Sequence, residues 1–295
     1  MGRTISEGDG QSHVLGGGVV MKLGIVLRAD RIIRDEAFQQ QRIVTANGPV
    51  DRVFSGKLSG VETHFLYGRF PGLRTPSWDI PYETNQLVFD ELGVDHVIGT
   101  FVVGGVDSRV SSGDLVIPHD LVCFAGPQRA MTAPNARFSN AHVIPSLCPS
   151  LRALLVRGAR VTGIPVHEEG VYFGFYGFGR IETLAELELM QRLGATVVGQ
   201  TMDPEFTLAR QRSLHYASIA VAIDSYDEMR DESTKDPDEF RARSREAIGI
   251  GREKFEAILE AGLATRTSEQ PDDCGCASRP RAKYRDMFTS YPEDM

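Results

Sequence analysis

The chain has 295 residues, a formal net charge of −8 and a hydrophobic fraction of 41%, a composition that supports a packed core and argues against wholesale disorder. An acidic chain without a basic stripe is not expected to bind nucleic acid. Its apolar stretches, such as 97–106, are shorter than the roughly 20 residues of a membrane-spanning helix. Four cysteines are too few for a secreted disulfide scaffold of this length. We therefore expect a soluble, cytoplasmic protein that interacts with neither membranes nor nucleic acid.

The two ends of the chain differ in composition from the middle. Residues 1–20 are polar and rich in glycine, so we expect a disordered tail, and Met21 is a candidate start of translation. Residues 266–295 are polar without a visible period and are predicted to form an irregular C-terminal tail. No repeat or linker interrupts 21–265, which predicts a single domain.

Strands and helices are expected to alternate along that domain. A strand is predicted over 23–27, a helix over 83–92, a buried strand over 97–103 and a short strand over 115–118. The second half reads as a helix over 182–193, a strand over 196–199, a helix from Asp203 to 211, a strand over 216–223 and a long amphipathic helix over 236–262. This order predicts an α/β fold with a mixed or parallel sheet and helices on both faces.

Polar residues follow three of the predicted strands, in the segments 104–109, 200–203 and 224–227. Ligands of open α/β sheets bind beyond the carboxyl ends of the strands, so the coincidence favours a ligand site there. Each segment also has a simpler interpretation: paired glycine makes turns, while Asp203 and Asp224 are suitable helix caps. The pattern does not name a substrate.

Several familiar signatures are absent from the sequence. It contains no glycine-rich dinucleotide or triphosphate motif, no H-E-x-x-H and no G-x-S-x-G. The histidines show no metal-ligand spacing, and His215, at the start of a predicted strand, is assigned a structural role. The run Cys274-Gly275-Cys276 is too short for a zinc pair, and we expect two free thiols, with a redox pair as the alternative. The residues thus indicate no metal site.

Four segments in the C-terminal half carry a resemblance to a known family. They are G-R-I-E-T-L-A-E at 179–186, L-G-A-T-V-V-G-Q-T-M-D-P-E at 193–205, L-A-R at 208–210 and Y-A-S-I-A at 216–220. They resemble the motifs of the purine nucleoside phosphorylase and methylthioadenosine phosphorylase family, G-P-R-F-E-T-x-A-E, L-G-A-D-V-V-G-M-[ST]-x-V-P-E, L-A-R-E and Y-A-S-I-A. A weaker likeness runs through 82–118, so that most of 21–265 is covered.

The resemblance implies a single domain with a distorted, barrel-like mixed sheet flanked by helices, assembled as a homotrimer or hexamer. Such enzymes are pentosyltransferases of nucleoside metabolism and purine salvage. They cleave the N-glycosidic bond of purine nucleosides with phosphate as co-substrate and need no metal or organic cofactor. The sugar passes through an oxocarbenium-like state, and a side chain near purine N7 stabilises the leaving base.

The resemblance also assigns residues to the base. Asp224 matches the position that contacts N7, where aspartate in place of asparagine is typical of members that take 6-aminopurines. A carboxylic acid that keeps its proton can donate it as the base leaves. Members of this type carry a second acidic residue two positions on, where this chain has Tyr226, with Asp227 one later. Glu182 matches a glutamate placed against the base, and Ile181 replaces a phenylalanine that stacks on it.

The ribose side retains less of the pattern. Gln200 replaces the methionine under the ribose, and Thr201 keeps a hydroxyl that touches phosphate. His142 lies near the position of a histidine that reaches the 5′ group of a neighbouring subunit's nucleoside.

The phosphate elements depart furthest from the family. Its G-G-T-G loop is replaced by L-R-A-D at 27–30, its R-H-G by R-F-P at 69–71, and a hydroxyl of T-[TA]-A-x-G-S by Phe101. Arg69, Thr201 and Arg28 remain as candidate phosphate ligands. Anion recognition relies on converging donors and positive charge, so weak phosphate binding is expected.

These assignments predict cleavage of a 6-aminopurine nucleoside such as methylthioadenosine or adenosine. Phosphorolysis is the family's default reaction. The altered phosphate site leaves two alternatives open: water or another nucleophile in specialised metabolism, and a non-catalytic protein that binds purine nucleosides.

Overall fold

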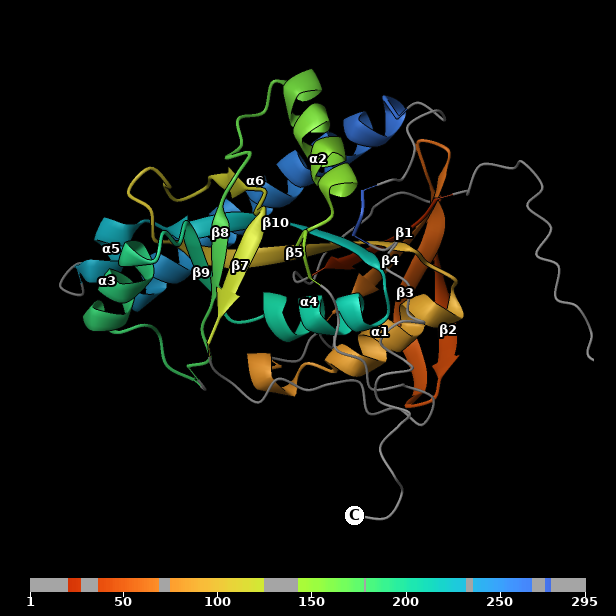
Figure 1. The fold of residues 1–295 in the computed structure, drawn as a ribbon, viewed down its shortest axis with the longest axis horizontal. Coiled ribbons are helices and arrows are strands. Elements are labelled where there is room, and N and C mark those ends of the chain that lie inside the picture. Colours follow the sequence, from red (N-terminus) through yellow and green to blue (C-terminus); the bar gives the residue numbers. More distant parts are fainter. Residues whose placement is uncertain are drawn as a thin grey trace, which may run out of the picture.

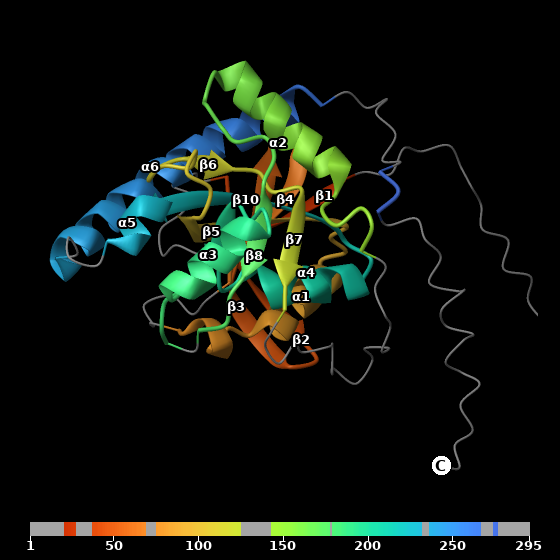
Figure 2. The same cartoon turned by 60° about the vertical axis from the view of Figure 1, so that its left-hand side comes forward.

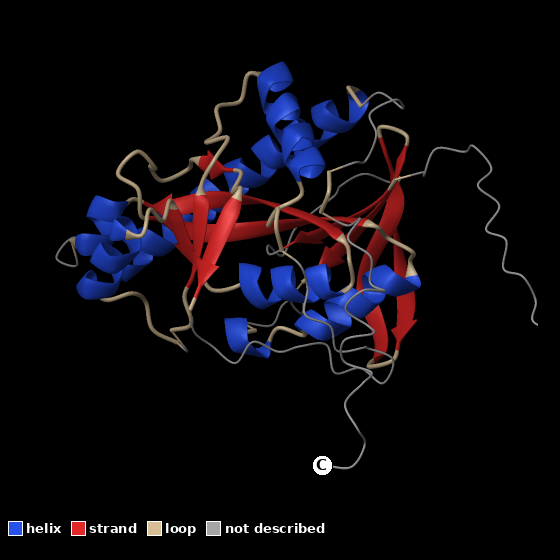
Figure 3. Ribbon diagram, in the orientation of Figure 1, coloured by secondary structure: helices blue, strands red, loops and turns tan. Residues whose placement is uncertain are grey.

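The structure is a computed structural model that describes residues 21–27, 37–68, 75–124, 143–177, 179–231, 236–266 and 274–276. The expected tail 1–20 and most of the expected tail 266–295 lie outside these ranges. Figures 1 and 3 show a large mixed sheet running through the molecule with helices on both sides. The predicted α/β class, a mixed sheet flanked by helices, is therefore confirmed.

Four parallel strands form the centre of the sheet. They are β1 (Lys22–Leu27), β4 (Val61–Tyr67), β5 (His96–Gly105) and β10 (His215–Asp224). β1 lies between β4 and β5, and β10 pairs with β5 from end to end. The predicted strands at 23–27, 97–103 and 216–223 fall on three of these four.

A β-meander that the sequence did not predict widens the sheet on the β4 side. β2 (Gln39–Thr45) pairs antiparallel with β3 (Gly48–Leu58), which pairs antiparallel with β4. Ser59 and Gly60 connect β3 to β4, both with positive φ, 47° and 82°. Two consecutive residues of this kind form the tight turn whose twist matches that of antiparallel strands.

The other half of the sheet turns away from the parallel centre. β9 (Val197–Gly199) pairs antiparallel with the end of β5, and β8 (Val171–Gly174) and β7 (Asp120–Cys123) follow in parallel. β6 (Leu115–Val116) pairs antiparallel with β10. β5 and β10 therefore connect the two halves.

Helices cover both faces of the centre. In Figure 1, α2 (Pro149–Thr162) and α6 (Pro237–Ala264) lie above the sheet, while α1 (Tyr82–Glu91) and α4 (Met202–Gln211) lie below it. α3 (Leu184–Arg192) and α5 (Tyr226–Arg230) lie at one end, and Figure 2 brings that end forward. A short 3₁₀ turn, Ser77–Asp79, precedes α1. None of the helices in the described ranges is long and apolar enough to cross a membrane.

The core has two layers because strand side chains alternate between the faces. Leu23, Ile25 and Leu27 of β1 pack with α2 and α6, while Val26 packs on the opposite side with residues of α1 and α4. β10 alternates in the same way. The strand β10 is thus held between the two packed layers.

The predicted helices are present, with bounds set by their caps. α3 begins at Leu184 instead of 182 because Thr183 caps it, accepting a hydrogen bond from the Glu186 N–H while the Glu186 carboxylate accepts from the Thr183 N–H. Asp203 keeps an extended backbone (φ −101°, ψ 132°) within the first turn of α4, and its carboxylate accepts a hydrogen bond of 2.5 Å from the Thr207 hydroxyl.

Candidate functional site

Asp224 ends β10 beside a glycine of β5. The two strands pair in register up to Ala222 and Val103; the register then shifts, and Asp224 lies opposite Gly104. Such an irregularity re-aims the side chains that follow it. The Asp224 residue is only 8% exposed. A Cβ on residue 104 would lie 3.0 Å from Asp224 Oδ1, so glycine at this position leaves room for the carboxyl group.

The chain directly after Asp224 is fixed by a helix cap. The Ser225 hydroxyl accepts from the Glu228 N–H (3.3 Å), and the Glu228 carboxylate accepts from the Ser225 N–H (2.8 Å). Tyr226 points inward into an apolar cluster, and Asp227 is exposed in the first turn of α5. The assignment of Asp227 to the base remains a prediction.

The polar segment 200–203 follows β9, which pairs with Gly104 on the other side of β5 from Asp224. β9 runs antiparallel to β5, so its carboxyl end points back along β5 instead of toward Asp224. The Ser218 hydroxyl contacts Met202 Sδ at 3.7 Å, which places the start of α4 six residues before Asp224 along β10. The polar segments that follow β9 and β10 therefore leave the sheet in opposite directions on the two sides of Gly104.

Gln200 and Thr201 are both held by neighbouring chain segments. The Gln200 amide oxygen accepts from the Ser77 hydroxyl (3.2 Å), and its nitrogen donates to the Arg180 carbonyl (3.3 Å). Thr201 is 7% exposed, and its N–H donates to the Tyr172 hydroxyl at 3.2 Å. The ring of Tyr172 also packs against Phe101, with centroids 6.0 Å apart. Tyr172 therefore joins Thr201 to the phenylalanine of β5.

The loop before α3 carries the remaining residues predicted to contact the base. Ile181 is 61% exposed, and Glu182 is half-buried. Arg180 donates hydrogen bonds of 2.7 and 2.8 Å to Glu186, and these bonds lower the pKa of the Glu186 carboxyl to about 2. The Arg180–Glu186 ion pair and the Thr183 cap together hold this loop against the start of α3.

A hollow of about 620 Å³, part of it open to solvent, lies between the loop and the β8 end of the sheet. Its lining combines aromatic side chains with one ion pair: Phe124, Phe173, Phe175, Tyr176, Arg180 and Glu186. Burial raises the pKa of Tyr176, so its hydroxyl keeps its proton and donates to the Asp203 carbonyl at 2.5 Å. Apolar walls with a few polar groups are typical of small-molecule sites.

Three of the predicted site residues cannot be placed. Arg28, Arg69 and His142 lie outside the described residues. Their assignments to phosphate and to the 5′ group of the nucleoside stay predictions.

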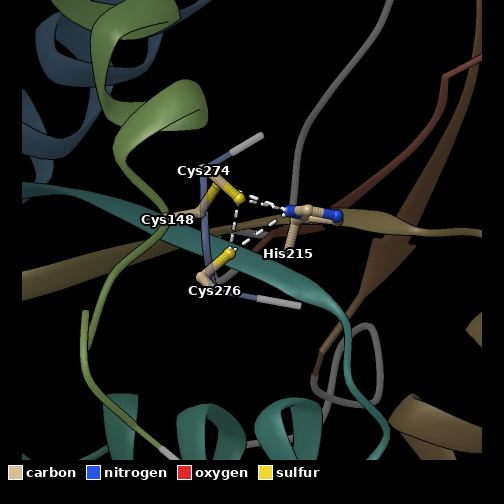
Figure 4. A group of neighbouring side chains, drawn as sticks. All are labelled: Cys148, His215, Cys274 and Cys276. Carbon is tan, nitrogen blue, oxygen red and sulfur yellow. Dashed lines mark hydrogen bonds between the residues drawn. The ribbon is translucent and has the colours of Figure 1, made fainter. Parts of the chain in front are cut away.

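A second polar cluster, which the sequence did not reveal, lies at the opposite end of β10 (Figure 4). It consists of Cys148, His215, Cys274 and Cys276, whose ligand atoms all lie within 4.8 Å of one another. His215 Nδ1 is 3.6 Å from Cys148 Sγ, 3.1 Å from Cys274 Sγ and 3.2 Å from Cys276 Sγ. The two thiols that we expected to be free in a polar tail are thus packed against the core. The only local signal was C-G-C, because the partners are far away in sequence.

Comparison with known proteins places the whole domain in context. A model of the phosphorylase superfamily matches residues 22–260. The S-methyl-5′-thioadenosine phosphorylase of Thermococcus kodakarensis is 29% identical over 244 residues, covering 81% of this chain and 91% of the relative. A probable 6-oxopurine nucleoside phosphorylase of the same organism is 34% identical over 190 residues, covering 62% and 70%. The structure of methylthioadenosine phosphorylase from Schistosoma mansoni in complex with adenine matches with a TM-score of 0.72 at 22% identity, over 83% of this chain and 91% of that one, which shows a common fold.

Proposed function

The chain belongs to the phosphorylase superfamily, and from this membership we propose that it cleaves the N-glycosidic bond of a purine nucleoside as a pentosyltransferase. The names of the two relatives share a substrate class, purine nucleosides, and a reaction, phosphorolysis. The observation that carries the proposal is Asp224, a buried carboxyl group that β10 aims at a glycine of β5.

Asp224 acts on the leaving base. When the bond from the sugar to N9 breaks, electrons flow into the purine ring, and N7 becomes more basic. Asp224 in its protonated form donates to N7, so that the base departs without a full negative charge. A positioned general acid contributes about 10²–10⁴-fold to a rate. The low exposure of Asp224 strengthens this hydrogen bond, because little water competes for it.

The same carboxyl group favours 6-aminopurines. Adenine presents an acceptor at N7 and a donor at its 6-amino group, whereas a 6-oxopurine presents two acceptors on that edge. A protonated carboxyl group offers one donor and one acceptor, which complements adenine. Asparagine offers two N–H hydrogens in place of the single acidic O–H, so it can also serve a base edge with two acceptors, and the identity of residue 224 influences the choice of base.

Among the described residues, the nucleophile side offers few donors to hold phosphate. The Thr201 N–H is engaged by the Tyr172 hydroxyl, and the Thr100 hydroxyl donates to the Val26 carbonyl at 3.0 Å. Phe101 places a buried ring where the family carries a hydroxyl. Loss of several donors weakens anion binding. Phosphate therefore binds loosely, or another nucleophile takes its place.

A product assay separates three functions that this site could have: phosphorolysis, hydrolysis and binding without turnover. Methylthioadenosine and adenosine are incubated with the protein, with and without phosphate, and both the base and the sugar product are identified. Phosphorolysis yields a sugar 1-phosphate at a rate that saturates weakly with phosphate, which is the expected result. Free sugar at a phosphate-independent rate would indicate hydrolysis. Binding of adenosine without any product would indicate a non-catalytic nucleoside-binding protein and would overturn the proposal.

Base selection is tested with Asp224→Asn. We expect the ratio of adenosine to inosine cleavage to fall by about tenfold or more, since asparagine loses the acidic proton but gains a second N–H donor that suits the two acceptors of inosine. Asp231→Asn, which changes an exposed carboxylate just after α5, serves as the matched control. An unchanged ratio in Asp224→Asn would remove this residue from base recognition.

The protein is further proposed to form a homotrimer or hexamer in the cytoplasm, with His142 reaching a neighbouring subunit. Four apolar side chains on α3 and beside it are 43–61% exposed: Ile181, Leu184, Leu189 and Leu193. Exposed apolar side chains on one element favour an interface there. A monomer at micromolar concentration in light scattering would contradict this assembly.

A further inference from the structure

The cluster of Cys148, His215, Cys274 and Cys276 joins three separate parts of the chain. Cys148 immediately precedes α2, His215 begins β10, and the two other cysteines come from the short segment that returns to the core after α6. Figure 4 shows all three sulfur atoms facing the same ring nitrogen of His215. Four side chains of metal-ligating type thus converge on one point from three directions.

We propose that these four side chains bind one zinc ion. Zinc lies about 2.3 Å from thiolate sulfur and about 2.0–2.1 Å from imidazole nitrogen, so a tetrahedral ion keeps its ligand atoms about 3.5–3.8 Å apart. Four of the ligand-atom pairs in the cluster measure 2.9–3.6 Å, and every pair lies within 4.8 Å. Movements of a fraction of an ångström therefore convert the cluster into a tetrahedral shell. Three cysteines and one histidine are a common structural zinc set.

Backbone contacts hold the ligands in place independently of a metal. The Cys148 N–H donates to the Tyr216 carbonyl (2.7 Å), and the His215 N–H donates to the Asp95 carbonyl (2.9 Å). His96 stacks on the His215 ring, with centroids 4.3 Å apart and an angle of 8° between the planes. The ring is therefore held with Nδ1 toward the sulfur atoms, as a zinc ligand requires.

The C-G-C run is shaped to present two sulfur atoms on one side. Gly275 has a φ of 66°, a conformation that glycine adopts at low cost. The turn brings Cys274 Sγ to 2.9 Å from Cys276 Sγ. A larger residue at 275 would be strained in this conformation. The glycine turn lets two cysteines at a spacing too short for a zinc pair on its own present both sulfur atoms as half of a site.

The surroundings suit a bound ion. Cys148 is fully buried and Cys276 is 6% exposed, so little water competes for the ligands. On binding, the three thiols release their protons to solvent and the neutral imidazole coordinates through Nδ1, leaving a net charge of −1 at the site. The buried guanidinium of Arg210 donates to the Cys276 carbonyl and to the Leu214 carbonyl, and so brings a compensating positive charge to the same segment.

The role of this zinc is structural. Four protein ligands complete a tetrahedral shell, whereas catalytic zinc keeps an open position. The site also lies about 30 Å from Asp224, since β10 rises ~3.3 Å per residue between His215 and its last residue. The ion therefore fastens the C-terminal segment to the starts of α2 and β10 without touching the reaction.

Metal analysis of the full-length protein tests the proposal. Protein produced with zinc in the medium and purified under reducing conditions is analysed by plasma mass spectrometry, beside a Cys274→Ser/Cys276→Ser double variant. We expect about one zinc per chain in the unaltered protein and a fall of about tenfold or more in the double variant. Cys123→Ser, which alters the cysteine outside the cluster, is the matched control and should keep its zinc. Equal zinc in all three proteins, or none in the unaltered protein, would overturn the proposal.

Two further measurements distinguish zinc binding from the effects of a folding defect and from a disulfide. Cobalt added to metal-free protein should give the visible bands and the sulfur-to-cobalt charge-transfer band of a tetrahedral thiolate site, and His215→Ala, which leaves all three thiols in place, should weaken and shift them. Alkylation should modify the cluster cysteines only after a chelator is added. If the cysteines instead became open to alkylation only after a reductant was added, and the intact mass were lower by two hydrogens, the cluster would contain a disulfide. That result would overturn the zinc assignment.

Discussion

The two ends of β10 carry different chemistry on the same rigid strand. At the Asp224 end, a carboxyl group lies beside Gly104 of β5, just before the start of α5. At the His215 end, four side chains of metal-ligating type converge from three parts of the chain. In the two proposals above, a strand packed on both faces separates the residue that acts on the base from the cluster that binds the metal ion. A change at one end should therefore leave the property of the other end intact.

The largest effect is expected from Asp224→Ala. Removing the general acid should lower kcat by about 10²–10⁴-fold, while the melting temperature changes little because the residue ends its strand. The measurement is base release from the best nucleoside substrate, with thermal unfolding recorded alongside. Zinc content should not change in this variant. A rate near that of the unaltered protein would exclude Asp224 from the mechanism.

Metal removal should lower the melting temperature and leave turnover unchanged. A cross-link that closes long loops contributes about 2–5 kcal/mol, and at ~2–4 °C per kcal/mol the melting temperature should fall by roughly 4–20 °C in Cys276→Ser or after chelation. Turnover at a temperature well below unfolding should stay unchanged, since the cluster is remote from Asp224. Cys123→Ser again serves as the control. If turnover fell in step with zinc at low temperature, the two ends would not be independent.

A smaller effect on activity is expected from Gly104→Ala. The added Cβ would lie 2.7 Å from Met229 Sδ and 3.0 Å from Asp224 Oδ1. The flexible methionine can move aside, but the carboxyl group must shift by a few tenths of an ångström, which should lower kcat by about tenfold. Gly249→Ala, on α6 with open space around the new methyl group, is the matched control and should retain full activity. Equal activity of the two variants would mean that the carboxyl group tolerates displacement.

The two ends also differ in how far the sequence predicts them. Motif residues around 193–224 are continuous in the chain, so their strands, helices and the position of Asp224 follow from local pattern and resemblance. The antiparallel direction of β9 does not follow, because strand direction depends on the path of the chain in space. The zinc cluster could not be predicted, since Cys148, His215 and the C-G-C run come together only in the folded chain.

The strands missed near the N-terminus have a different explanation. β2 reads Q-Q-Q-R-I-V-T, and most of its side chains are exposed, so no alternation of polar and apolar residues marks it. α2 carried signals that could have been used: a proline in its first turn and buried leucines at Leu151, Leu154 and Leu155. Apolar strands such as β5 and β10 were predictable because they are buried on both faces.

The smallest effect concerns the loop near the Asp224 end and is expected from Glu186→Gln. Glutamine can keep the cap on Thr183 but loses the charge that pairs with Arg180. The pKa of Glu186 is lowered from 4.5 to about 2, chiefly by the hydrogen bonds from Arg180. Because the folded-state value is depressed, the ion pair stabilises the protein fully above pH 4.5, and this stabilisation is lost as the pH falls toward 2.

The expected result is a slightly lower melting temperature for Glu186→Gln at pH 6, with the two unfolding curves converging as the pH approaches 3. The effect is small because both side chains are partly exposed, 51% and 32%, and solvent screens the pair. Added salt should shrink the difference at pH 6. Glu188→Gln, an exposed position on the same helix, is the control. Interactions of the charged carboxylate disappear as Glu186 takes up its proton. A difference in melting temperature that instead grew toward low pH would mean that the protonated carboxyl group holds this loop.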